Sequence, residues 1–157
     1  MSRSSRPACL NGIEIKQWVH GTARKMLAAK SESRATWNEA WFETYLELGG
    51  QSRTTGEKGC PKSAAYGLWS LGLLAGVARN FRKWSIAQVR KELGKNAAYA
   101  VIAAELMTGG AAPTVPSLWP RIRKRYEELT GEEAARSEQG EIRLVIALYC
   151  EAGLQKR

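Results

Sequence analysis

The chain of 157 residues is predicted to fold as an all-α protein, a single compact domain of about six to seven helices. Apolar residues recur at three- and four-residue spacing in one segment after another. Glycines and polar capping residues separate these segments, as expected at helix ends. Because 44% of the residues are hydrophobic, the chain can also fill one core of ordinary domain size.

The N-terminal part is predicted to contain two amphipathic helices after a flexible basic arm at 1–12. The first helix begins near Glu14, and the second begins with a capping box formed by Thr36 and Glu39. The second helix ends at Gly49-Gly50. Apolar residues keep the helical spacing on both: Ile15, Trp18, Val19, Met26 and Leu27 on the first, and Trp37, Ala40, Trp41, Tyr45 and Leu48 on the second.

The segment 59–74 is predicted to be one short buried helix around which the fold is organised. Pro61 suits the first turn, where its missing N–H is not needed. Gly72 suits the left-handed position just beyond the helix end, with Leu73 folding back as its apolar partner. Small residues such as Gly67 would let a neighbouring helix approach closely, and we expect that neighbour to be the last helix.

The remaining sequence is predicted to contain four more helices. Ser85 and Gln88 form a second capping box. Ser117 is expected to cap a helix that carries Pro120 in its first turn, where proline is tolerated. The expected ranges are 85–93 ended by Gly94, an Ala-rich buried helix at 96–107, 117–129 ended by Gly131, and 140–152 ended by Gly153-Leu154.

Landmarks of the first three helices return in the last three at a shift of about 80 to 82 residues. The segment 37–49 matches 119–131, and 59–73 matches 140–154. The alternative explanation is that Trp and Gly-Leu occur at helix ends in many helical proteins. We predict two tandem three-helix repeats about a pseudo-twofold axis, at 13–78 and 97–157, joined by a basic linker helix at 79–96.

The central helix also carries a motif, Gly59-Cys60-Pro61-Lys62 with Ala64, followed by Gly67-Leu68 and Gly72-Leu73. This run resembles the signature of a family of small uncharacterised bacterial proteins, in which a helix with Ala-Leu and Gly-Leu closes the chain, as 147–154 does here. The resemblance covers residues 15–155 and implies a helical fold with an important central helix. It implies no activity.

The net charge of +9 and the pI of about 9.7 favour an anionic partner or surface. The charge is uneven, because 1–36 and 62–95 are strongly basic whereas 39–57 is net acidic. All 15 acidic residues are glutamates, and there is a single histidine, His20. Metal sites and catalytic relays usually combine several such residue types, so we expect no metal, no cofactor and no catalytic residue.

The sequence also predicts a protein without a membrane span. The longest uninterrupted apolar run, 97–104, is far shorter than the roughly 20 residues that a spanning helix needs. The first residues lack the apolar core of a signal peptide, which predicts a cytoplasmic location. Three cysteines without a CxxC pair make a disulfide framework or a structural zinc site improbable.

The segment 56–63 nearly matches the phosphate-binding loop GxxxxGK[ST]. Pro61 stands where that pattern needs glycine, and no strand precedes the segment, so we reject a nucleotide hydrolase. A general anion site at Lys58 and Lys62 remains as a weaker expectation. Cys60 lies before a helix, where a thiol could pair with His20 as a nucleophile, but a structural role without catalysis is the favoured interpretation.

Basic residues cluster around 79–95 and 121–125, and within 79–84 they are interleaved with Phe81 and Trp84. This mixture suits phosphate neutralisation and base stacking, although a solvated loop would have the same composition. We predict a non-enzymatic module that engages a protein partner, of adaptor or inhibitor type. The alternatives are nucleic-acid binding and, third, an enzyme centred on Cys60. The candidate partner or nucleic-acid contacts are Arg79, Phe81, Arg82, Lys83, Trp84, Arg90, Lys91, Arg121, Arg123, Lys124 and Arg125.

Overall fold

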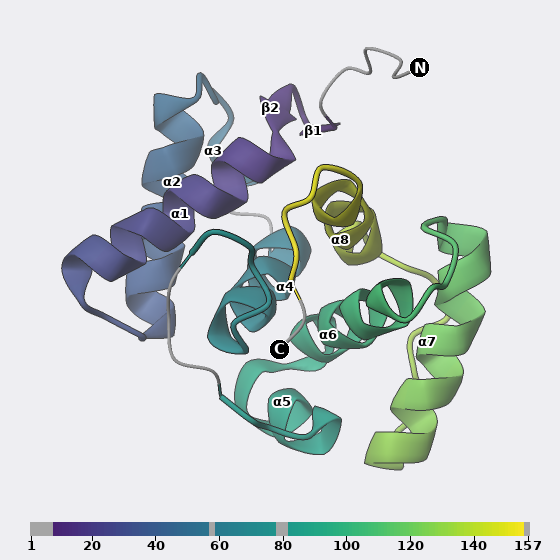
Figure 1. The fold of residues 1–157 in the computed structure, drawn as a ribbon. Coiled ribbons are helices and arrows are strands. Elements are labelled where there is room, and N and C mark those ends of the chain that lie inside the picture. Colours follow the sequence, from purple (N-terminus) through teal and green to yellow (C-terminus); the bar gives the residue numbers. More distant parts are fainter. Residues whose placement is uncertain (1–7, 57–58, 78–81, 156–157) are drawn as a thin grey trace.

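The computed structural model describes residues 8–56, 59–77 and 82–155, and it confirms the all-α class (Figure 1). Within these ranges it has seven helices of eight or more residues, one four-residue helix and one small hairpin. The elements are β1 (Cys9–Leu10), β2 (Ile13–Glu14), α1 (Ile15–Ala29), α2 (Arg34–Glu47), α3 (Arg53–Gly56), α4 (Gly59–Ser70), α5 (Ile86–Leu93), α6 (Lys95–Thr108), α7 (Val115–Thr130) and α8 (Glu141–Cys150).

Helix α6 lies at the centre of the fold, where α4, α5, α7 and α8 pack around it (Figure 1). Every residue in 97–104 is buried. The contact with α4 is close because Gly67 has no side chain: a Cβ there would lie 2.7 Å from the Cβ of Ala97. The expectation that Gly67 packs on the last helix is therefore wrong, although α4 and α8 do touch.

The N-terminal helices α1 and α2 pack together over a continuous set of stacked aromatic rings. Trp18 and Trp41 lie 4.4 Å apart between ring centroids, and Trp37 lies 5.5 Å from Trp69 of α4. The indole N–H groups of Trp18 and Trp37 donate to main-chain carbonyls, so these polar atoms are satisfied inside the core. The predicted burial of Trp18, Trp37, Trp41 and Trp119 is confirmed, and Trp69 is buried with them.

The N-terminal caps of α2 and α7 lie three residues before the predicted ones. Ser33 caps α2 by accepting from the amide of Thr36, and Thr114 caps α7 by accepting from the amide of Ser117. Each segment offers two hydroxyl side chains three residues apart, and the earlier one is used, which adds a turn to the helix. Consequently Pro120 lies inside α7 rather than in its first turn. The predicted caps at Thr36 and Ser117 are wrong.

Other helix ends agree with the sequence. Ser85 caps α5 through the amide of Gln88, and Gly94 and Gly131 both adopt positive φ at helix termini. Two small elements were not predicted. The helix α3 lies in the segment 51–58, where a loop rather than a helix was expected. The hairpin β1–β2 overlaps the predicted flexible arm at 1–12. Elements of two to four residues are too short to show a hydrophobic period.

The two halves end in the same helix-terminating motif, the Schellman arrangement. After α4, the amide of Leu73 donates to the Leu68 carbonyl at 2.9 Å, and Gly72 is left-handed with φ 73 as predicted. After α8, the amide of Gly153 donates to the Leu148 carbonyl at 2.6 Å, but the left-handed residue is Ala152, with φ 57. The predicted equivalence of Gly72 with Gly153 is therefore wrong by one residue.

The segments that follow these two helix ends pair with each other, and we call this pairing the seam. Leu74 and Leu154 form an antiparallel bridge, with Ala75 N donating to Gly153 O at 2.9 Å and Gln155 N to Leu73 O at 2.8 Å. From residue 74 to residue 154 the offset is 80, the same offset that relates Gly72 to Ala152. This local symmetry agrees with a repeat, but the division into 13–78, 79–96 and 97–157 stays a prediction.

Candidate functional site

Three hollows among the described residues lie around α1 and α2. The first, which we call the α1 groove, has a volume of about 570 Å³. The second, of about 380 Å³, lies between α2, α3 and the start of α4. The third, of about 410 Å³, lies between the C-terminal part of α1 and the N-terminal part of α2. The N-terminal helix pair therefore offers open hollows in which a ligand could bind.

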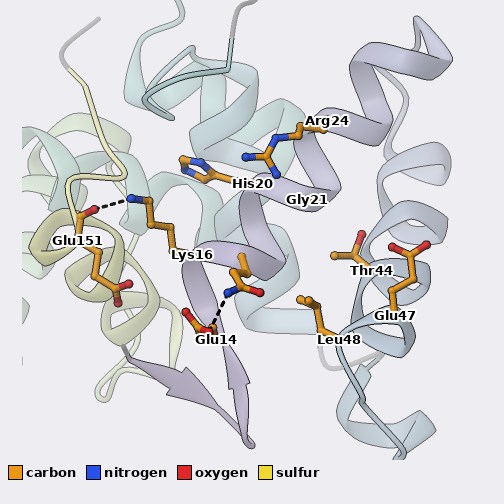
Figure 2. Close-up of a pocket in the computed structure, with 10 residues that line it drawn as sticks. Glu14, Lys16, His20, Gly21, Arg24, Thr44, Glu47, Leu48 and Glu151 are labelled. Atoms are coloured by element: carbon orange, nitrogen blue, oxygen red, sulfur yellow. Dashed lines mark hydrogen bonds between the residues drawn. The ribbon is translucent and has the colours of Figure 1, made fainter. Parts of the chain in front are cut away.

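The α1 groove follows the exposed side of α1 (Figure 2). Gly21 lies in its middle, where a Cβ would come within 2.8 Å of the Thr44 methyl, so its missing side chain lets α1 and α2 cross closely. Figure 2 shows side chains from α2 on one side of the groove and Glu151, just after α8, on the other. The lining residues are Glu14, Lys16, Gln17, His20, Gly21, Arg24, Thr44, Glu47, Leu48 and Glu151.

One side of the groove carries nitrogen atoms spaced one helical turn apart. Lys16, His20 and Arg24 stand at i, i+4 and i+8 of α1, so they lie in a row along the helix. The Lys16 ammonium donates to the main-chain carbonyl of Glu151 at 2.8 Å. Arg24 is exposed and has no ion pair with any residue that the structure describes.

The carboxylates of the groove already have partners. Glu47 forms an ion pair with Lys25 at 2.8 Å, and Glu14 accepts from the Gln17 amide at 2.8 Å. The Glu151 carboxylate accepts from the backbone N–H of Ala8 at 3.0 Å. The groove thus contains both signs of charge. Lys25 neutralises Glu47, whereas Glu14 and Glu151 accept hydrogen bonds from neutral N–H groups and keep their negative charge.

His20 is buried, with 7% of its surface exposed, and its Nε2 lies 3.4 Å from the carbonyl oxygen of Gly153. Burial lowers the pKa of the imidazole, and the nearby positive charges of Lys16 and Arg24 lower the pKa further. The contact with Gly153 opposes this shift. His20 is therefore held neutral at pH 7, between the groove and the seam.

The predicted basic linker is only partly described. Arg79, Phe81 and Lys58 lie outside the described residues. Arg82 forms an ion pair with Glu32, and its guanidinium lies 4.8 Å from the ring centroid of the half-buried Trp84. One face of this indole is consequently covered by the chain itself. Lys83 and Lys91 are exposed.

The side chain of Arg90 is engaged in a small polar cluster between α5 and α7. Its Nε donates to Glu132 at 3.1 Å, and the Tyr126 hydroxyl donates to the same oxygen at 2.9 Å. These two donors lower the pKa of the Glu132 carboxyl. Burial, followed by the hydrogen bond to Glu132, raises the pKa of Tyr126 to about 12. The cluster holds α5, α7 and the loop after α7 together, which is a structural role.

The basic residues of α7 are more available. Arg121, Lys124 and Arg125 are exposed, whereas Arg123 is half-buried and its Nε has no hydrogen-bond partner among the described residues. Lys62, the described member of the predicted anion site, is half-buried beside α2 and lines the second hollow. Of the predicted basic surface, Arg82 and Arg90 are thus engaged within the chain, whereas Lys83, Lys91 and three residues of α7 are exposed.

The pair of Cys60 and His20, which the sequence analysis considered as a possible nucleophile and base, does not come together in any hollow described above. Cys60 is half-buried rather than mostly buried, and it does not line the α1 groove that contains His20. Cys9 and Cys150 are exposed, and neither forms a disulfide with a described residue. Among the described residues, no group of three His, Cys or Glu side chains could hold a metal ion.

Sequence reasoning did not identify the α1 groove. The row Lys16, His20 and Arg24 was visible as a four-residue spacing, which could have marked a cationic side on the first helix. The wall contributed by Glu151 could not be found this way, because it comes from the other end of the chain.

Fold and site together define an all-α single-domain protein with a groove of mixed charge on its N-terminal helix pair. The chain belongs to a family of unknown function, DUF6979, which matches residues 17–155. No curated protein and no solved structure matches the chain. The resemblance to an uncharacterised family is thus confirmed, while the Gly-Cys-Pro-Lys signature and a bacterial origin stay predictions.

In the part of the chain that the structure describes, no helix has both the length and the apolar character required to cross a membrane. The cytoplasmic location stays a prediction.

Proposed function

We propose that the protein is a non-enzymatic binding module that engages a protein partner through the α1 groove, as an adaptor or an inhibitor. The observation that carries this proposal is the groove itself. It offers about 570 Å³ lined by charged and polar side chains from β2, α1, α2 and the segment after α8. Charges of both signs arranged in this way favour one partner and one orientation over others.

The partner is expected to carry complementary charges. Arg24, exposed beside the groove, would meet an acidic side chain, and Glu47 across the groove would meet a basic one. Because Glu47 is already paired with Lys25, its exchange of partners would contribute little affinity, whereas Arg24 would gain a first partner. The exposed basic residues of α7 would accelerate association with a partner of net negative charge.

A capture experiment tests the proposal. The immobilised protein is incubated with nuclease-treated native lysate, beside a groove variant, Arg24→Glu with Glu47→Lys. The control is Arg136→Glu with Glu133→Lys in the loop after α7, which also exchanges one exposed charge of each sign. A partner retained by the wild type and the control, and bound at least about tenfold more weakly by the groove variant, supports the proposal. A partner lost by the control alone contradicts it.

Nucleic-acid binding remains the second candidate because Arg121, Lys124 and Arg125 are exposed together on α7. If nucleic acid is the partner, log affinity should fall linearly with log salt, and Arg121→Gln should reduce the slope by about one unit. Trp84→Ala should then have little effect on binding, because Arg82 covers one face of the ring and the half-buried side chain packs against the core. The groove variant would bind nucleic acid like the wild type, and such a result would replace the protein-partner proposal.

A further inference from the structure

The row of Lys16, His20 and Arg24 is more than a set of surface charges. All three side chains line the same groove, and two of them are held in place by the end of the chain. The Lys16 ammonium is fixed by the Glu151 carbonyl, and the His20 imidazole lies against the Gly153 carbonyl. The positions of these nitrogen atoms are therefore set before any ligand arrives, which lowers the entropic cost of binding.

The cationic side of this groove keeps nitrogen atoms that no described residue uses. Each of the three lining carboxylates accepts a hydrogen bond or forms an ion pair within the chain, from Gln17, Lys25 or Ala8. Arg24 has no ion pair in the described part of the chain, and no hydrogen bond of the described residues uses Nδ1 of His20. A ligand with oxygen atoms and negative charge would provide what these nitrogens lack.

We propose that Lys16, His20 and Arg24 form an oxyanion subsite of the α1 groove, which takes a carboxylate or phosphate group of the partner. As the group binds, His20 takes up a proton from the solvent. This inference rests on the proposed function, since it names the chemistry that the groove recognises. It is also independent of any particular partner, because small oxyanions can occupy the subsite alone.

The surroundings of His20 determine the coupling to protons. Lys16 and Arg24 flank it on its own helix, and Glu14 from β2, Glu47 from α2 and Glu151 from the segment after α8 line the same groove. In the free protein, burial and the two cations disfavour the imidazolium. A bound oxyanion offsets both cations and can accept a hydrogen bond from the imidazolium, so it favours the charged ring. By linkage, an oxyanion whose own charge stays constant must then bind more tightly as the pH falls towards the lowered pKa of the free imidazole.

The single histidine makes the test direct, because every imidazole resonance in the NMR spectrum belongs to His20. The midpoint of its titration is measured alone, with inorganic phosphate, with a short acetylated tetraglutamate peptide, and with sodium chloride at equal ionic strength. We expect phosphate, the peptide or both to raise the midpoint by about one pH unit, a tenfold coupling, and chloride to leave it unchanged. A response to one probe alone identifies phosphate or carboxylate as the recognised group.

Two substitutions complete the test. Arg24→Gln should weaken the probe at least about fivefold and reduce the shift of His20, whereas Arg136→Gln, the same change at an exposed arginine outside the groove, should not. His20→Gln should make the affinity for the peptide, whose carboxylates stay ionised, independent of pH between about pH 6 and pH 8. A midpoint that neither probe moves, or that Arg24→Gln and Arg136→Gln affect equally, overturns the inference. The capture experiment can still succeed in that case, so failure of the subsite and failure of the proposed function are distinguishable.

Discussion

Helices α1 and α6, which the predicted repeat treats as equivalent, have similar lengths but different surroundings. α6 is buried all round from 97 to 104, whereas α1 keeps an exposed side on which the α1 groove lies. The segment before α6 is the helix α5, which packs on it, and the segment before α1 is the small hairpin β1–β2. The candidate site therefore lies on α1, the helix that, in the described part of the chain, has no counterpart of α5 packed on its exposed side.

The largest effect is expected from a change that tests the tight packing of α6. Gly67→Leu places a side chain where even a Cβ would lie 2.7 Å from Ala97, with backbone atoms close behind it. We expect a loss of about 1–3 kcal/mol or more in the free energy of unfolding, measured by urea denaturation. Gly59→Ala in the same helix is the control, because nothing lies within 4 Å of its added Cβ. Equal stability of Gly67→Leu and wild type would contradict the close α4–α6 contact.

The next effect tests the helix ends that the two halves share. Gly72→Ala forces a Cβ into a left-handed position, which costs about 1–2 kcal/mol, whereas Ala152→Gly relieves that strain and should stabilise by a similar amount. Thermal unfolding of the two variants should therefore shift in opposite directions. Shifts in the same direction would show that Gly72 and Ala152 are not equivalent.

A smaller effect is expected at the crossing of α1 and α2. Gly21→Ala improves helix propensity by about 0.8–1 kcal/mol, but its Cβ would overlap the Thr44 methyl at 2.8 Å. These terms oppose each other, so we expect a net change below about 1 kcal/mol. Thr44→Ser removes the methyl and keeps the hydroxyl that donates to the Ala40 carbonyl. In that background Gly21→Ala should become stabilising, and additive effects in this double-mutant cycle would refute the overlap.

The smallest effect at neutral pH concerns the polar cluster between α5 and α7. The pKa of Tyr126 is raised to about 12 in the folded protein. The stability that its protonated hydroxyl contributes is therefore complete below the pKa of about 10 in the unfolded chain, and it is lost as the pH rises towards 12. Tyr126→Phe should remove this alkaline loss of stability. The control Tyr149→Phe, at a half-buried position on α8, should retain it. Identical alkaline unfolding of all three proteins would count against the Tyr126–Glu132 hydrogen bond.

Much of the fold could be predicted because its information is local. Apolar spacing identified the seven longer helices, and it placed Trp18, Trp37 and Trp41 in the core. The caps failed where two hydroxyl residues compete, as at Ser33 and Thr36, since sequence alone does not say which one the backbone uses.

The candidate site could not be predicted because its information is not local. The groove needs Glu151 beside Lys16, and nothing in either neighbourhood indicates that contact. Charge density indicated 79–95 instead. That expectation could not account for Glu32 and Glu132, which are distant in sequence and pair with Arg82 and Arg90.

The seam also has a consequence for the order in which the molecule folds. Neighbouring helices such as α1 and α2 can dock after closing a short loop, whereas the seam must join residues 74 and 154, and closing a longer loop costs more chain entropy. We therefore expect the seam to form late. Because the Gly153 carbonyl that pairs with Ala75 also lies against His20, the native surroundings of this imidazole are complete only when the seam has closed. In a refolding experiment, its native resonance would mark the final step.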